Sequence, residues 1–279
     1  MPNRSNLIYR YDGSFEGLLC CVFESYDQHE IPLDIFSPAS LQTTLLPEKD
    51  IRTETAKANR VLASIPQKIS PAALDFIKRA FLTCHAQKEL YILLFLRMGY
   101  RYGASVMNML TDDVVNTLFT AVKHLDKESH LFKGFIRFSV FNNALVAEIE
   151  PKNVVLPFLV RHFRERYPEE RFLIYDKTHR MGLIYQPYQA TIIPIEELDL
   201  PETDENERSF RELWQLFYDT IEIKERHNPK CRMSLMPKRY WKNMTEFGSA
   251  EEKPSVSRHG NDAVKSLNFK IAAEEKLLD

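Results

Sequence analysis

The sequence predicts an α+β fold with a helical layer, an antiparallel sheet of ββαββ order and a long C-terminal amphipathic helix. Apolar residues recur at helical spacing in the first half of the chain, alternate with polar residues from Phe135, and return to helical spacing from Phe210. We therefore expect a strand, helix opening and helical layer in residues 1–130, a ββαββ-plus-helix module in 131–247 and a polar tail in 248–279.

The first part is expected to open with a strand and a helix. Residues 6–11 alternate, and Asp12-Gly13 forms a turn that places Ser14 as a helix N-cap. Ser70-Pro71 supplies the N-cap and first position of another helix. Two further helices are expected, over residues 88–109 and from Thr111. The stretch between the first two helices is expected to form short strands and loops, because it is interrupted by Pro32, Pro38, Pro47 and Pro66.

The second part is expected to form a sheet with one helix on its face. Asn142-Asn143 tolerates the positive φ of a tight hairpin turn between two alternating runs. Pro157 suits the first turn of a helix, and the runs RFLIYD and RMGLIY predict two more strands around a turn at Lys177-Thr178. The order ββαββ predicts an antiparallel sheet.

An acidic stretch and an amphipathic helix follow the sheet. Residues 196–207 hold seven acidic residues and no basic one, which predicts a surface linker. Ser209 and Glu212 match a capping box, so the helix is expected to begin there and to end near Asn228-Pro229. A short terminal helix is expected from Ala263.

The composition excludes several classes of protein. The four cysteines form no C-x-x-C pair, so neither a zinc site nor a disulfide framework is expected, and we predict reduced thiols in a cytoplasmic protein. The longest apolar stretch is too short to span a membrane, and the N-terminus lacks the apolar region of a signal peptide. Without a P-loop or a G-x-G-x-x-G motif, no nucleotide cofactor is predicted, and no metal site is predicted either.

Residues 224–242, which we call the exit segment, carry seven Lys or Arg and one Glu, a local charge of +6. The whole chain has a net charge of -2. Cations beside aromatic rings suit phosphates and unstacked bases, and about five phosphate contacts would give a logarithmic salt slope of roughly -3.5 to -4.5. The alternative is a solvated helix end whose basic stems cover apolar surface. The candidate nucleic-acid-binding residues are Arg226, Lys230, Arg232, Lys238, Arg239, Tyr240 and Lys242, with Arg161 and Arg164 from the preceding helix.

A second candidate site is the turn of Asp176, His179 and Arg180. A carboxylate that orients a histidine is the minimum for general acid–base catalysis. The alternative is an ordinary polar hairpin turn, since no third group marks a nucleophile. Asp12, at a strand-to-helix turn, has the same two interpretations, catalytic carboxylate or turn cap.

Three stretches resemble one bacterial family: YDGSFEGLLCCVFESY, FIRFSVFNNALVAEIEPKNVVLPFLVRHFRERYPEERFLIYDKTHRMGLIY and NPKCRMSLMPKRYW. That family of unknown function is associated with DNA metabolism or DNA repair. It is linked to a radical-SAM protein, and related domains are fused to uracil-DNA-glycosylase-like domains. The resemblance covers residues 6–247 and implies DNA and one of these proteins as partners, but no catalytic residue. The chain lacks the C-x-x-x-C-x-x-C run of a radical-SAM enzyme.

Three functions follow as hypotheses, and the sequence leaves open whether the protein is an enzyme. The first is an accessory protein of DNA repair or modification that binds DNA through the exit segment. The second is a nuclease or lyase that uses the turn at Asp176. The third is an assembly scaffold whose exit segment docks on an acidic partner or on the chain's own residues 196–207.

Overall fold

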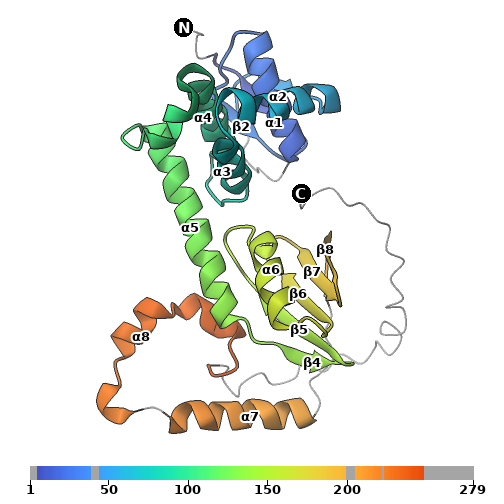
Figure 1. The fold of residues 1–279 in the computed structure, drawn as a ribbon, viewed down its shortest axis with the longest axis vertical. Helices are drawn as coiled ribbons and strands as arrows, with labels where there is room; N and C mark the ends of the chain where they lie inside the picture. Colours follow the sequence, from blue (N-terminus) through green and yellow to red (C-terminus); the bar gives the residue numbers. More distant parts are fainter. Residues whose placement is uncertain (1–4, 39–43, 199–204, 222, 248–279) are drawn as a thin grey trace. The chain divides into compact units, whose positions relative to one another are not determined.

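The first 135 residues combine a small parallel sheet with a layer of helices (Figure 1). The computed structural model describes residues 5–38, 44–198, 205–221 and 223–247. The expected tail at 248–279, with its terminal helix, lies outside these residues. Strand β1 is central in the order β2-β1-β3. The elements are β1 (Ile8–Arg10), α1 (Phe15–Asp27), β2 (Asp34–Phe36), β3 (Glu48–Asp50), α2 (Thr55–Lys68), α3 (Pro71–Phe81), α4 (Lys88–Tyr102), a 3-10 helix (Gly103–Asn108) and α5 (Asp113–Phe135).

Helices α1 and α3 begin directly after serine residues that cap their N-terminal ends. Ser14 accepts a hydrogen bond from the Gly17 amide, and Ser70 accepts one from the Ala73 amide, as the sequence predicts. Helix α2 corrects the prediction of strands and loops before residue 70: Pro66 lies inside it, close to its C-terminal end. The expected helix over 88–109 is also shorter, because α4 ends at Tyr102 and the next residue, Gly103, has a φ of +60°.

The second part is a five-stranded sheet in the order β4-β5-β6-β7-β8. The α+β class is confirmed, but the sheet is not entirely antiparallel: β5 and β6 are parallel, because α6 carries the chain across between them. The last strand was not predicted. The elements are β4 (Ser139–Phe141), β5 (Ala144–Ile149), α6 (Leu156–Arg166), β6 (Phe172–Asp176), β7 (Met181–Gln186) and β8 (Gln189–Pro194).

The C-terminal elements follow the sheet. Helix α7 (Glu205–Thr220) begins one turn before the predicted Ser209 capping box and ends eight residues before Asn228, so both predicted ends are wrong. Acidic side chains in the first helical turn favour this earlier start. After α7 come a 3-10 helix (Lys224–Arg226), α8 (Pro229–Leu235) and a second 3-10 helix (Lys238–Asn243).

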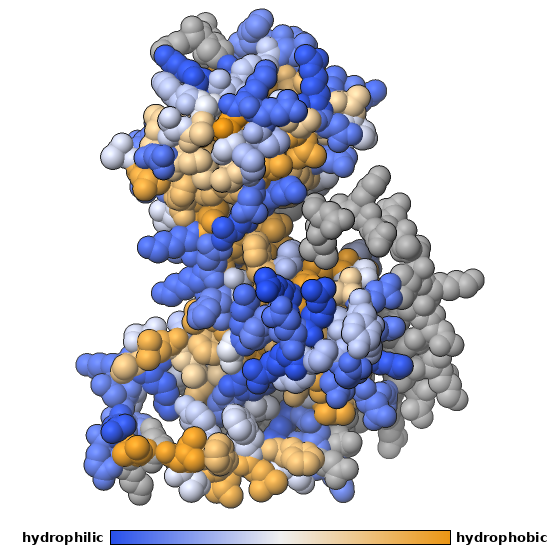
Figure 2. All heavy atoms as spheres, viewed as in Figure 1, coloured by the Kyte–Doolittle hydropathy of each residue, from blue (hydrophilic) through white to orange (hydrophobic). Residues whose placement is uncertain are grey.

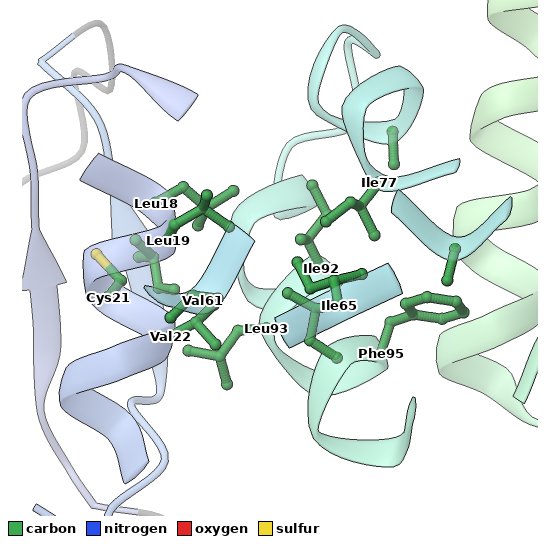
Figure 3. Packing of buried hydrophobic residues seen from close by; sticks show 14 of the residues in the cluster. Leu18, Leu19, Cys21, Val22, Val61, Ile65, Ile77, Ile92, Leu93 and Phe95 are labelled. Atoms are coloured by element: carbon green, nitrogen blue, oxygen red, sulfur yellow. The ribbon is translucent and has the colours of Figure 1, made fainter. Parts of the chain in front are cut away.

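Two hydrophobic clusters meet along α5. Side chains of α1 to α4 pack in the first, where Figure 3 shows Leu19, Ile65 and Leu93. The first half of α5 joins this cluster, and its second half joins a cluster with the five-stranded sheet, α6 and the exit segment. The exit segment is therefore part of the second core. In the described residues, no helix combines the length and apolar character needed to cross a membrane.

Candidate nucleic-acid interface

The exit segment folds back towards α5 through two short helices. Asn228 caps α8, because its Oδ1 accepts a hydrogen bond from the Cys231 amide at 3.0 Å, and Pro229 follows at the first helical position. Pro237 precedes the second 3-10 helix. This path brings Tyr240 into the second hydrophobic cluster.

Tyr240 is a core residue and does not present its ring to a ligand. It is 5% exposed, and its ring lies 5.1 Å from that of Phe132 and 5.2 Å from that of Phe135. Burial raises the pKa of its phenol, against the lowering effect of Arg239. The prediction that Tyr240 stacks on a base is therefore corrected, because α5 already covers its ring.

Arg239 is held by a buried carboxylate. Its guanidinium lies 3.0 Å from Glu128 of α5, whose side chain is 3% exposed, and it lies over the Tyr240 ring. The same carboxylate accepts hydrogen bonds from the amide of Lys152 at 3.1 Å and from the amide of Asn153 at 2.9 Å. These contacts make Arg239 a structural residue of the exit segment.

Two more cations of the exit segment, Arg232 and Lys238, lie over the indole ring of Trp241. Its indole stacks on Phe247 with a centroid distance of 4.4 Å, and its Nε1 donates to the Met236 carbonyl at 2.9 Å. The guanidinium of Arg232 lies 5.3 Å from the indole centroid, and the ammonium of Lys238 lies 5.8 Å from it. Both cations therefore turn towards an aromatic ring of the same segment.

The remaining cations divide into paired and exposed groups. Lys242 pairs with Glu150, the residue directly after β5, at 2.6 Å. Arg226 and Lys230 are exposed, and their side chains form no ion pair within the described part of the chain. The cationic surface that faces outward is thus smaller than the sequence charge of the exit segment predicts.

The two candidate arginines of α6, Arg161 and Arg164, have exposed side chains. Arg161 pairs with Glu165 one turn later at 2.8 Å, in a highly exposed contact, and Arg164 is exposed. Neither forms a hydrogen bond or ion pair with the exit segment among the described residues. The structure therefore does not join them to that segment in one contact network.

The turn after β6 contains an ordered Asp–His pair. Asp176 is fully buried; its Oδ1 accepts the amides of Thr178 and His179, both at 3.0 Å, and its Oδ2 lies 2.7 Å from His179 Nδ1. Arg180 has a φ of 54° and an exposed side chain, and it does not join this pair. Asp176 thus both caps a turn and orients an imidazole, and in the described part of the chain no Ser, Thr, Cys or Lys side chain forms a hydrogen bond with His179.

Asp12 serves as a turn cap between two segments. Its Oδ1 accepts the Ser14 amide at 2.9 Å, and its Oδ2 accepts the Thr53 hydroxyl at 2.7 Å. Burial raises the pKa of this carboxyl, but the hydrogen bonds from Ser14 and Thr53 outweigh it and the pKa is lowered. Asp12 therefore remains charged and joins the loop after β1 to the loop after β3.

Carboxylates distant in the sequence are the residues that sequence reasoning missed. Glu128 and Glu150 pair with Arg239 and Lys242 of the exit segment, and Glu246 pairs with Arg137, which precedes β4; these pairings have no local signal in the sequence. In the described residues, no group of three or more His, Cys, Asp or Glu side chains is placed to hold a metal ion.

Residues 86–246 match the family model named Domain of unknown function (DUF4130), over more than half of the chain. The chain belongs to the DUF4130 family. Its DUF4130 region begins just before α4 and contains the five-stranded sheet, the Asp176 turn and the exit segment. Comparisons of this DUF4130 protein with curated proteins and with solved structures give no match.

Proposed function

We propose that this DUF4130 protein is an accessory protein of DNA repair or DNA modification that binds DNA through exposed basic side chains. The exposed and unpaired side chains of Arg226 and Lys230 are the observation that supports it. Arg164 of α6 adds a third exposed cation. Arginine and lysine in this state bind phosphate without first breaking a contact inside the protein.

The small number of available cations sets the expected strength of binding. Two or three phosphate contacts give a logarithmic salt slope of about -1.4 to -2.7, shallower than the full exit segment would give. Such binding is weak and independent of base sequence. It fits a protein that holds DNA while another protein performs the chemistry.

That other protein is proposed from the resemblance described above. A radical-SAM protein or a uracil-DNA-glycosylase-like protein would supply the reaction, and this chain would supply part of the contact with DNA. Co-purification of the two proteins from a host that expresses both tests the pairing. Recovery of neither candidate partner above the level of an untagged control contradicts it.

Charge reversal at the exposed cations tests DNA binding. We expect Arg226→Glu with Lys230→Glu to remove most binding to single-strand, duplex, uracil-containing and abasic DNA at low salt, measured by fluorescence anisotropy. Lys123→Glu with Lys127→Glu is the matched control, because both lysines are exposed on α5 and the change in net charge is the same. Equal binding by the two double variants, or no binding by the unmodified protein, contradicts the proposal.

A second candidate function is protein assembly, and a different observation favours it. Large apolar side chains of α7 are exposed, and contiguous apolar surface of this kind marks protein interaction sites.

A further inference from the structure

Helix α7 exposes the residues that its sequence pattern predicts to be buried. We call Phe210, Leu213, Trp214, Phe217 and Ile221 the apolar stripe; each is between 41% and 69% exposed. Figure 2 shows hydrophobic side chains along α7 at the lower edge of the view. Residues spaced by three and four lie on one side of a helix, so the stripe is continuous.

The side of α7 that contacts the rest of the protein is mainly polar. Arg211 donates to the Ser139 hydroxyl of β4 at 2.6 Å, and Gln215 donates to the Thr245 carbonyl at 2.8 Å. One turn further, Tyr218 contacts the ring of Phe247. Trp214, at the edge of the stripe, donates from its Nε1 to Glu246 at 3.4 Å. These contacts fix α7 along its polar side and leave the other members of the apolar stripe at least half exposed.

The two ends of α7 carry opposite charges, and these charges indicate which partner surface covers the stripe. Residues 196–207, before the stripe, carry seven acids and no base, whereas residues 224–242, after it, carry a charge of +6. Glu205 lies five residues before Phe210, and Arg226 lies five residues after Ile221. Both side chains are exposed, and neither forms an ion pair within the described structure.

We propose that the apolar stripe is the interface with a second copy of this chain, with the two α7 helices antiparallel. A two-fold axis makes each contact reciprocal, so the acidic end of one helix meets the basic end of the other twice. A parallel pair would place like charges together. Within one chain, α7 separates the two ends by about 24 Å, so a straight helix cannot bring them together.

Self-association is separate from the proposed DNA binding, but Arg226 takes part in both contacts. Arg226 would contact Glu205 of the second copy or a DNA phosphate, so DNA and self-association are expected to compete. The apolar stripe takes no part in the proposed DNA contact. Its substitution therefore separates the two proposals.

Sedimentation velocity of the full chain over a range of concentrations tests the pairing. A single pair of four-turn helices is a small interface, so we expect a monomer–dimer equilibrium with a dissociation constant on the order of micromolar. Leu213→Asp with Phe217→Asp should weaken it by about 30-fold or more. Leu110→Asp is the control, since Leu110 is 53% exposed outside α7. Because all these side chains are exposed, circular dichroism should show unchanged folding.

A charge exchange distinguishes the second copy from any other partner. Glu205→Lys or Arg226→Glu alone should weaken the dimer, while the chain that carries both changes should regain it, because the reciprocal pairs are restored with opposite sign. Both single variants should keep the native circular dichroism spectrum. A protein that stays monomeric up to high micromolar concentration, or a double variant weaker than both single ones, overturns the proposal. A monomeric result would assign the stripe to a different protein.

Discussion

Glu128 and Arg239 form an ion pair of 3.0 Å in which the carboxylate is almost completely buried and the guanidinium is partly exposed. The pair joins the middle of α5 to the end of the exit segment. A buried carboxylate that loses its partners has a high desolvation cost, whereas a partly exposed arginine that loses its partner regains water. Removing the Glu128 side chain is therefore expected to destabilise the fold more than removing the Arg239 side chain.

Arg239→Ala is expected to lower the free energy of unfolding by about 1 kcal/mol, and Glu128→Ala by about 3 kcal/mol. The larger effect follows because Glu128 also accepts amide hydrogen bonds from Lys152 and Asn153. Urea unfolding followed by circular dichroism measures both values. Lys230→Ala, at an exposed position, should leave the free energy of unfolding unchanged. If Lys230→Ala destabilises the protein as much as Glu128→Ala does, the structural role of the Glu128–Arg239 pair is contradicted.

Glu246 makes the C-terminal region sensitive to acid. Its side chain is 1% exposed, and Arg137 contacts it at 2.6 Å. Burial raises the pKa of this carboxyl, but hydrogen bonds from Arg137 and Trp214 outweigh it, so the pKa lies below its ordinary value of 4.5. Because the folded pKa is depressed, its stabilising contribution is present above pH 4.5 and is lost as the pH falls through the folded pKa.

Tryptophan fluorescence can follow this loss, because the two tryptophans of the chain, Trp214 and Trp241, both lie in the C-terminal region. We expect Arg137→Met to be less stable than the unmodified protein at pH 7 by about 2 kcal/mol, with the difference shrinking below pH 4.5. Lys127→Met, which changes the same charge at an exposed site of α5, is the control. A difference that stays constant from pH 7 to pH 3 contradicts the role of Glu246.

Elements decided by neighbouring residues could be predicted from the sequence. The caps at Ser14 and Ser70 and the positive φ of Asn142 and Asn143 depend on a few adjacent residues, so the pattern and the structure agree. The sequence pattern does not predict α2, because the prolines between residues 32 and 66 favour short strands and loops. Near the end of a helix, burial of Val61 and Ile65 maintains the fold despite the missing amide.

Contacts between distant residues could not be predicted. Arg137 and Glu246 are 109 residues apart, and Lys242 and Glu150 are 92 apart, so no periodicity relates them. The first pair joins the segment before β4 to the end of the described chain, and the second holds a cation of the exit segment at the end of β5. The pattern of α7 likewise shows which residues share one side of the helix, but not whether the fold covers that side.

Two glycines in helices should respond in opposite directions to the same substitution. A Cβ at Gly17 would overlap the Asp12 carboxylate and lie 2.8 Å from the Thr53 hydroxyl, whereas a Cβ at Gly134 meets nothing within 4 Å. Alanine normally stabilises a helix relative to glycine. We expect Gly134→Ala to gain about 0.5–1 kcal/mol and Gly17→Ala to lose about 1–3 kcal/mol.

Thermal unfolding of the two single variants measures this contrast. The gain at Gly134 controls for helix propensity, so the loss at Gly17 reports the Asp12 turn. Thr53→Ala should reduce the loss at Gly17, because it removes the Thr53 hydroxyl, one of the three groups that the new methyl meets. Stabilisation by Gly17→Ala would show that the Asp12 turn adjusts without cost.

Substitutions at Asp176 and His179 test whether their turn has a structural or a catalytic role. Asp176→Ala leaves two amides and the His179 imidazole without their acceptor, so we expect a loss of about 2–3 kcal/mol. His179→Ala removes one partly exposed group and should cost less than about 1 kcal/mol. If the turn were the centre of a nuclease or lyase, His179→Ala would abolish cleavage of abasic or duplex DNA while remaining folded. We expect that the unmodified protein cleaves neither substrate, because the described contacts of Asp176 and His179 are those of a turn cap. Cleavage by the unmodified protein that disappears in His179→Ala would establish the enzyme instead.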